Sequence, residues 1–580
     1  MIKSINKVPL IGLSSVLLFS VWAILILYLA PQYQNAAGND PLAMIDILYP
    51  SFWIILLVFV GLCFLAFVQS DVPHWLHMLL LAQFALMLYY TPFLLSGFSW
   101  SPDSLWHGGV ASYIPQILSG APVALSDYAH AYPLLPISTY VVEQVFRVNI
   151  FVYSLYIYPV ICTVLFSALA YFFAYRMFGS KAAFLTMLFT LPALHYVEMH
   201  VSPFSAGTII LLVALILSTY KSQLTISLSI LTFFLLTIIH PISPLMLGAY
   251  FFSVFAVNFL FRRKNAEDVP SKLFFLPHLI LIFTLWVAWT TYAMTIYIGV
   301  QTSVLNLLNF NFLSRIFYAS EFTVGQGGFI YSWIQNLSLV VYAIIFVLIF
   351  TGRLPGISAI RDFFKKKFSF LSFFRKKYSS LTYRRMSLTL AALIYAAGGF
   401  LLFLSSGERF LLGRGLLYFI FMGSMVIATY FVTQGSKYQR AKKILALNLV
   451  VFLVCTFPVI SYSKEAYNTF TPSANAGLQF LTDKIDLSQN SVSMTSSQQL
   501  ASYANLSKGL DLVRFPPNLR AIEPDVIAMR INGYFLISMR NDLSFTNNSY
   551  TRLDANLQGN PDYSKVYSNP QFEIFMNSGS

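Results

Sequence analysis

Long apolar stretches separated by short polar ones recur along most of the chain. Most of them approach the roughly 20 residues that a helix needs to cross a bilayer. The separations around residues 199–203 and 240–243 are short and contain proline, so they predict pairs of spans joined by tight turns. The pattern predicts thirteen membrane-spanning helices, at 9–30, 51–69, 75–95, 150–175, 182–198, 203–220, 224–239, 242–261, 274–300, 330–352, 386–405, 415–433 and 444–461.

The pattern changes after residue 461, where apolar residues alternate or cluster in short runs punctuated by Asn, Gly and Pro. Such runs are typical of strands. We expect a helix at 473–485 and strands at 491–495, 526–529, 534–539, 565–567 and 572–576. The sequence therefore predicts a polytopic transmembrane domain at 1–461 and a small mixed α/β domain at 462–580.

Composition supports a membrane protein. Hydrophobic residues make up 57% of the chain and charged residues 10%, and the mean hydropathy is +0.68. A soluble protein of this size could not cover its exterior with so few charges. The expected fold class is an all-α polytopic membrane domain followed by the small α/β domain.

The formal net charge of +14 raises the question of nucleic-acid binding, but the placement of the charge argues against it. If Met1 is cytoplasmic, most of the 36 Lys and Arg residues fall in inner segments, as the positive-inside rule requires. With thirteen spans, the domain at 462–580 is then extracytosolic. We therefore predict a multi-pass protein of the cell (plasma) membrane that contacts membrane lipids and binds no nucleic acid. The only Lys or Arg residues in the outer loops between spans are Arg147, Arg315, Arg409 and Arg414.

Motifs of soluble enzymes are missing from the sequence, including a phosphate-binding Walker loop, a His-Glu-x-x-His helix and a Gly-x-Ser-x-Gly elbow. The glycine-rich segment 325–328 has no strand before it, so we interpret it as a flexible turn. Cys63, Cys162 and Cys455 all fall within predicted spans. Their positions predict no disulfide framework outside the membrane and no cysteine-based metal site.

The outer loop at 96–149 contains the residues best suited to catalysis. Asp103 follows a span and His107 comes four residues later, so in a helical turn both side chains would share one face. A carboxylate beside an apolar surface can act as a base toward an acceptor hydroxyl, and an imidazole can orient it or bind substrate. The alternative is that Asp103 caps a helix at the membrane surface while His107 lies at headgroup level.

Further polar residues gather in the outer loops and turns. Asp127 and His130 lie in the same loop, Glu198 and His200 precede a span, and His240 begins a His-Pro turn. Prolines at such turns free carbonyl groups, and polar groups at membrane depth tend to line functional paths. We expect all five to bind substrate. The alternative is a set of solvated loop residues and interfacial turns.

Arg409 and Arg414 occupy the outer turn at 405–415. A guanidinium at the membrane boundary suits a lipid phosphate, because it offers two parallel N–H donors and a charge that does not titrate away. The alternatives are a salt bridge to Glu408 or an ordinary contact with lipid headgroups.

Four features together resemble polyprenyl-phosphate-dependent glycosyltransferases of the GT-C membrane fold. The first is the Asp-x-x-x-His sequence at 103–107, at the start of a large outer loop. The second is the segment Tyr-Pro-Leu-Leu-Pro at 132–136, which precedes a span. The third is Glu-Arg-Phe-Leu-Leu at 408–412, before a late span. The fourth is the tail, which closes with Lys-Val-Tyr-Ser-Asn at 565–569 and Phe-Glu-Ile-Phe at 572–575, similar to the terminal strands of prokaryotic members.

The resemblance implies an inverting transfer of a sugar from a polyprenyl-phosphate donor to a glycan, lipid or protein acceptor, in glycosylation of the cell envelope. Asp103 would be the catalytic base, and Arg409 and Arg414 would hold the leaving phosphate. Two features depart from the family: the loop follows the third span rather than the first, and the Trp-Trp-Asp-Tyr-Gly signature of oligosaccharyltransferases is absent. The absence of that signature favours transfer of a single sugar.

Two other classes of function stay open at this point. One is a transporter, flippase or polymerase of lipid-linked polysaccharide, and the other is a non-enzymatic membrane assembly factor. A transporter should place ionisable groups near the middle of its spans, whereas here they gather at the outer ends. No cofactor is specified by the sequence, although the acids of the outer loops offer oxygen ligands that suit Mg²⁺ or Mn²⁺.

Overall fold

The fold is taken from a computed structural model of the chain. The structure describes residues 7–36, 43–69, 71–96, 104, 107–108, 110–111, 114–119, 131–149, 152–193, 199–220, 222–260, 275–293, 325–350, 380–406, 409–432, 439–462, 491–494, 512–514, 533–538, 563–569 and 572–577.

Each of the thirteen predicted spans coincides with a helix, which confirms the all-α polytopic fold class of the membrane domain. Six helices of the described part are long and apolar enough to cross a membrane, and others are apolar but shorter. The thirteen helices are α1 (Lys7–Ala36), α3 (Ser51–Val68), α4 (His74–Tyr89), α11 (Tyr158–Phe178), α12 (Ser180–Ala193), α13 (Pro203–Leu217), α14 (Gln223–Ile239), α15 (Ser243–Leu260), α16 (Phe275–Ala293), α19 (Gly325–Phe350), α22 (Ser380–Ser406), α23 (Arg409–Val432) and α24 (Gln439–Tyr462).

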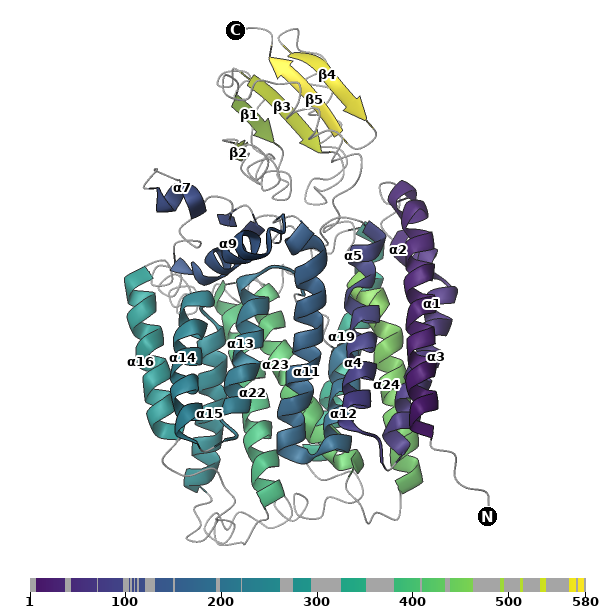
Figure 1. Ribbon diagram of the computed structural model, residues 1–580, viewed down its shortest axis with the longest axis vertical. Coiled ribbons are helices and arrows are strands. Elements are labelled where there is room, and N and C mark those ends of the chain that lie inside the picture. The colour runs from purple at the N-terminus through teal and green to yellow at the C-terminus, as the bar shows by residue number, and fades with distance from the viewer. Residues whose placement is uncertain are drawn as a thin grey trace.

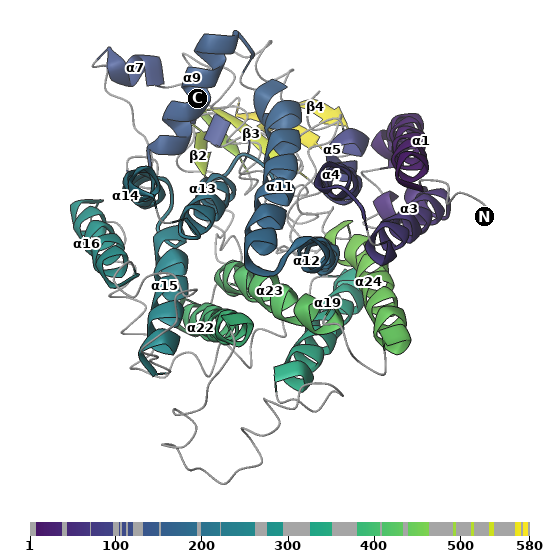
Figure 2. The same cartoon turned by 60° about the horizontal axis from the view of Figure 1, so that its bottom comes forward.

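The thirteen helices form one bundle (Figure 1). In the views of Figures 1 and 2, α14, α15 and α16 lie at one edge of the bundle, and α1 and α3 lie at the other. The shorter helices α2 (Ala43–Leu48), α5 (Thr91–Ser96), α7 (Ile114–Leu118) and α9 (Leu134–Phe146) gather at one end of it. At that end, α9 lies across the tops of the spans rather than along them (Figure 1).

Several element boundaries differ from the prediction. The span predicted at 75–95 is broken after α4, because Pro92 lacks an N–H and its ring obstructs the Leu88 carbonyl. The hydroxyl of Tyr462 donates to that carbonyl oxygen at 2.7 Å instead. The turn predicted at 405–415 is shorter than expected, since α22 runs to Ser406 and α23 already begins at Arg409.

Two further segments also differ from the prediction. The glycine-rich segment 325–328 is not a turn but the first turn of α19. The beginning of the fourth predicted span is a short π-helix, η1 (Tyr153–Ile157), which leads directly into α11. Single-turn π-helices of this kind are frequent at functional sites.

The tail contains a five-stranded mixed sheet with the order β2-β1-β3-β5-β4. Strand β1 pairs in parallel with β2 and β3, while β5 pairs antiparallel with β3 and β4. Of these five strands, all except β2 match predicted strands. The predicted helix at 473–485 and the predicted strand at 526–529 lie outside the described residues. The strands are β1 (Ser491–Met494), β2 (Leu512–Arg514), β3 (Gly533–Ser538), β4 (Tyr563–Asn569) and β5 (Phe572–Asn577).

The sheet lies beyond the end of the bundle that carries α9 (Figure 1). We call this the sheet end and the other the opposite end. At the opposite end, basic side chains of the predicted inner loops donate hydrogen bonds to carbonyl groups near the ends of helices. Arg384 donates to the carbonyl oxygen of Met177 at 2.7 Å, Arg385 donates to that of Thr429 at 3.1 Å, and Lys442 donates to that of Tyr430 at 3.2 Å.

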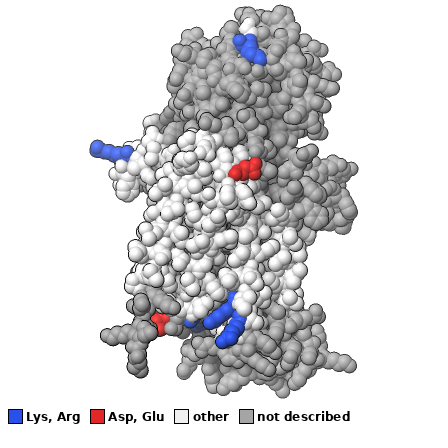
Figure 3. Space-filling model, turned by 90° about the vertical axis from the view of Figure 1, so that its right-hand side faces the viewer, with Lys and Arg blue, Asp and Glu red and all other residues white. Residues whose placement is uncertain are grey.

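These cations face the last carbonyl groups of α11 and α23, where the helix dipole favours positive charge. Between its ends, the face of the bundle in Figure 3 shows no charged side chain among the described residues. This distribution of charge is typical of a helical protein that spans a bilayer.

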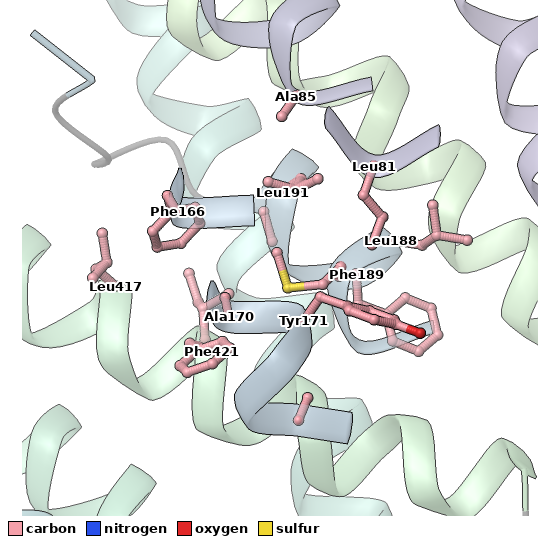
Figure 4. Packing of buried hydrophobic residues seen from close by; sticks show 14 of the residues in the cluster. Leu81, Ala85, Phe166, Ala170, Tyr171, Leu188, Phe189, Leu191, Leu417 and Phe421 are labelled. Carbon is pink, nitrogen blue, oxygen red and sulfur yellow. The ribbon is translucent and has the colours of Figure 1, made fainter. Parts of the chain in front are cut away.

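Aromatic and branched side chains from α4, α11, α12 and α23 pack together in the core of the bundle. Figure 4 shows Leu81, Phe166, Leu188 and Phe421 meeting there from these four helices. All four are almost fully buried. This packing fixes α11 and α23 relative to each other below the sheet end.

Helices α22 and α23 approach very closely at a glycine next to Arg414. A Cβ added at Gly415 would lie 2.6 Å from the Cα atom of Gly399 and 2.8 Å from the carbonyl oxygen of Tyr395. Both are backbone atoms, so neither can yield without moving a helix. The two glycines therefore set the distance between α22 and α23.

We expect Gly415→Ala to lower the apparent midpoint of thermal unfolding, because overpacking of a core typically costs about 1–3 kcal/mol. Gly398→Ala is the matched control, since no described atom lies within 4 Å of a Cβ built there. Thermal unfolding of both purified variants in detergent measures the effect. Equal midpoints for the two variants would contradict this account of the helix contact.

Candidate functional site

His240 occupies the turn between α14 and α15 at the sheet end and is fully buried. The backbone N–H of Ile242 donates to its Nδ1 at 3.3 Å. The hydroxyl of Ser243 lies 3.2 Å from the same nitrogen. The His-Pro turn thus holds the imidazole by one edge and points its other nitrogen away from the turn.

Arg414, in the second turn of α23, faces that other nitrogen. Its Nη1 lies 3.5 Å from His240 Nε2, and its guanidinium carbon lies 4.7 Å above the centre of the Phe204 ring. The rings of Phe204 and His240 are themselves 5.2 Å apart. Guanidinium, imidazole and phenyl group therefore form one cluster, in which the aromatic face stabilises the cation.

Both ring nitrogens of His240 face N–H donors. The backbone N–H of Ile242 lies 3.3 Å from Nδ1, and Nη1 of Arg414, which can only donate, lies 3.5 Å from Nε2. A neutral imidazole has a single acceptor nitrogen, so only one of these two contacts is a hydrogen bond. The charged N–H groups of a guanidinium held in this way suit an oxyanion.

The cluster is held by contacts between α13 and its neighbours. One turn below Phe204 and Arg414, the hydroxyls of Thr208 and Tyr418 hydrogen bond at 2.9 Å. A Cβ added at Gly207 would lie 2.6 Å from Ser243 Oγ and 3.3 Å from His240 Cβ. Gly207 therefore lets the His-Pro turn pack directly against α13.

The start of α13 is fixed by its own capping interactions. Ser202 and Ser205 form a capping box around Pro203, which occupies the first helical position. The hydroxyl of Ser205 donates to the carbonyl oxygen of His200 at 2.7 Å. The helix that carries Phe204 therefore begins at a defined place and angle.

His107 lies in a helical, buried part of the outer loop, together with Ser104 and Gly108. Its ring contributes to the lowered pKa of His240. The link between this loop and the turn after α14 is therefore electrostatic.

The structure brings together two of the predicted site residues, His240 and Arg414, and His107 acts on the pKa of His240. His200 is buried just before α13, with its carbonyl oxygen bonded as described above. Their roles stay predictions. The remaining predicted site residues lie outside the described part of the chain: Asp103, Asp127, His130 and Glu198, together with the side chain of Arg409.

Three residues of the cluster were not predicted. In the sequence, Phe204 is one apolar residue among many, although its place after Pro203 marks the start of a helix. Gly207 is a glycine within a predicted helix, and Ser243 is part of a predicted turn. None carries a sequence signal of its own, because each acts through a contact between helices.

Burial, together with the Arg414 guanidinium and the His107 ring, lowers the pKa of His240 well below its ordinary value. The group is therefore neutral in the folded chain at neutral pH. In the unfolded chain it takes up a proton as the pH falls below about 6.5. The folded state binds fewer protons there, so this residue reduces stability as the pH falls.

We expect the stability difference between wild type and His240→Gln to shrink as the pH falls from about 7 to 5, because glutamine has no proton to take up. Thermal unfolding of both proteins across this range measures the difference. His74→Gln, at the exposed start of α4, is the control substitution. Parallel pH profiles of wild type and His240→Gln would contradict a buried neutral imidazole.

No group of three or more His, Cys, Asp or Glu side chains within the described ranges lies close enough together to hold a metal ion. Asp103, Asp127 and Glu198, the acids of the outer loops and turns, lie outside those ranges.

Comparisons with known proteins reveal likeness in structure only. No protein-family model matches the chain, and no curated protein sequence matches it. The oligosaccharyltransferase of Archaeoglobus fulgidus in its apo form has a TM-score of 0.50 at 11% identity, over 87% of this chain and 74% of that one. The chain has the GT-C fold.

Other solved structures are similar at lower scores. ArnT from Cupriavidus metallidurans, bound to undecaprenyl phosphate, has a TM-score of 0.46 at 13% identity, over 87% of this chain and 98% of that one. A second structure of the Archaeoglobus fulgidus oligosaccharyltransferase, tethered to an acceptor peptide, has a TM-score of 0.45 at 13% identity, over 87% and 74% of the two chains.

Proposed function

We propose that this chain is an integral-membrane glycosyltransferase that moves a sugar from a polyprenyl-phosphate donor to an acceptor at the sheet end of the bundle. The observation that carries the proposal is the Arg414 guanidinium, held beside His240 and over the Phe204 ring in a GT-C fold. A leaving phosphate needs stabilisation of its charge more than it needs a strong acid. A guanidinium supplies that stabilisation.

The same site can serve the inverting reaction that the sequence motifs imply. Asp103 would deprotonate the acceptor hydroxyl, which attacks the anomeric carbon from the side opposite the phosphate. The bond between that carbon and the phosphate oxygen breaks, and its electrons pass to the phosphate. Arg414 and His240 would hold the released phosphate, with Arg409 as a further donor.

The position of the site supports work on the outer face of the plasma membrane. Basic side chains of the predicted inner loops donate to helix carbonyl groups at the opposite end of the bundle. The positive-inside rule favours an orientation with that end in the cytoplasm and the sheet end outside. The proposed acceptor is a glycan, lipid or protein of the cell envelope.

Binding and transfer by the purified chain in liposomes test this proposal. Wild type should bind undecaprenyl phosphate more tightly than undecaprenol, which lacks the phosphate, and should release undecaprenyl phosphate from a sugar-bearing donor when acceptor is present. Equal binding of the two lipids would refute the phosphate site. Movement of the sugar-bearing lipid between leaflets without loss of the sugar would favour a flippase instead.

A further inference from the structure

Two tryptophans of α16 donate hydrogen bonds to backbone carbonyl groups at the sheet end. Nε1 of Trp286 donates to the carbonyl oxygen of Pro241 at 2.9 Å, and Nε1 of Trp289 donates to that of Ala131 at 2.8 Å. The two tryptophans are three residues apart, so they share one face of the helix. That face therefore holds both the His-Pro turn and the segment that leads into α9.

The two indole N–H groups point into the protein, although α16 lies at the edge of the bundle (Figure 2). Tryptophans near the ends of membrane helices commonly serve as anchors at the level of the lipid headgroups. Trp286 and Trp289 are both half-buried, and their helix packs against α14 and α15, which flank the His-Pro turn. Their hydrogen bonds tie backbone segments together, which an anchor in the headgroup layer does not require.

The carbonyl group that Trp286 holds belongs to the peptide unit that seats His240. The peptide between Pro241 and Ile242 is planar, so its C=O and N–H point in opposite directions on one rigid group. Its oxygen accepts from Trp286, and its N–H lies 3.3 Å from Nδ1 of His240. Because the group is rigid, a bond that fixes the carbonyl also fixes the direction of the N–H.

The seating of this ring matters for the guanidinium beside it. Nε2, on the far side of the His240 ring, lies 3.5 Å from Nη1 of Arg414. A rotation of the 241–242 peptide would turn its N–H away from Nδ1 and release that edge of the imidazole. The chain of contacts thus runs from Trp286 through this peptide and His240 to Arg414.

We propose that Trp286 is a positioning residue for the phosphate site, acting on His240 through the 241–242 peptide. Its N–H stabilises the one orientation of that peptide in which the backbone N–H meets the imidazole. Hydrogen bonds in series also polarise one another, so the bond at the carbonyl oxygen strengthens the N–H at the other end as a donor. This inference rests on the function proposed above and adds a residue that prepares its phosphate site.

Binding of undecaprenyl phosphate to the full chain in nanodiscs tests the role of the indole N–H. Trp286→Phe keeps an aromatic ring without the donor and should weaken binding about three- to tenfold, the usual contribution of one neutral hydrogen bond. Replacement of Trp286 by 3-benzothienylalanine, which has nearly the same shape with sulfur in place of N–H, should weaken it equally. Trp22→Phe is the matched control, because Trp22 in α1 also donates within the protein, to Thr91 Oγ1 at 3.1 Å, and it should leave the affinity unchanged.

A double-mutant cycle separates positioning from a general loss of packing. In the His240→Ala background Trp286→Phe should change the affinity less than twofold, since no imidazole is left to position. Thermal unfolding verifies that each variant folds. Wild-type affinity in the benzothienylalanine variant, or an equal loss in the two backgrounds, would overturn the positioning role while leaving the phosphate site intact. Equal binding of undecaprenyl phosphate and undecaprenol by wild type would instead refute the proposed function itself.

Discussion

Arg414→Ala is expected to lower the rate of sugar transfer by about 100- to 1,000-fold, the effect of removing one donor to a developing oxyanion. The guanidinium is held over Phe204 and beside His240, so its donors are already in place before a phosphate arrives. Alanine would remove the charged donor from this position. Transfer from a labelled polyprenyl-phosphate donor in liposomes measures the loss.

The kind of cation should also matter at this position. Arg414→Lys keeps the charge but loses the planar fork and the stacking over Phe204. We therefore expect it to recover part of the activity, mainly through affinity for the donor. Full activity of the lysine variant would indicate a general electrostatic role rather than a phosphate clamp.

Arg176→Ala is a control that matches the chemistry of the change at position 414. Its guanidinium also lies over an aromatic ring, 4.3 Å from the centre of Tyr220, but at the opposite end of the bundle. It should leave transfer unchanged. An equal loss of activity in the two variants would mean that removal of a stacked arginine harms the fold, and the assignment of Arg414 to the phosphate would fail.

The helices of the bundle were predictable because each must present apolar side chains to the bilayer or to its neighbours over its whole length. The interruptions inside them were less predictable. The break after α4 depends on Tyr462, almost 400 residues later, whose hydroxyl satisfies the carbonyl freed by Pro92. A contact over that distance in the chain leaves no local pattern.

The site was predictable in its chemistry and only partly in its membership. Outer turns with imidazole or guanidinium groups pointed to His240 and Arg414, which the structure brings together. The seating of the His240 ring depends on the backbone N–H of Ile242, and the contact of Gly207 with the turn depends on how α13 packs. Both properties arise from packing, so they cannot be read from residue types alone.

Asp103 lies outside the described residues, so its role as the base follows from the sequence motif and not from an observed position. A base for the acceptor must lie within reach of the hydroxyl that attacks the anomeric carbon. The carboxylate at position 103 is the group that the motif assigns to this task.

Asp103→Asn is accordingly expected to abolish sugar transfer, with a loss of about 100- to 10,000-fold, because the amide has nearly the same shape but cannot accept the proton. Binding of undecaprenyl phosphate should persist, since His240 and Arg414 are unchanged, and this separates the variant from Arg414→Ala. Asp71→Asn, in the turn between α3 and α4 at the opposite end, is the control and should remain active. Normal turnover by the Asp103 variant would remove the carboxylate from the mechanism and leave a phosphate-binding site without its base.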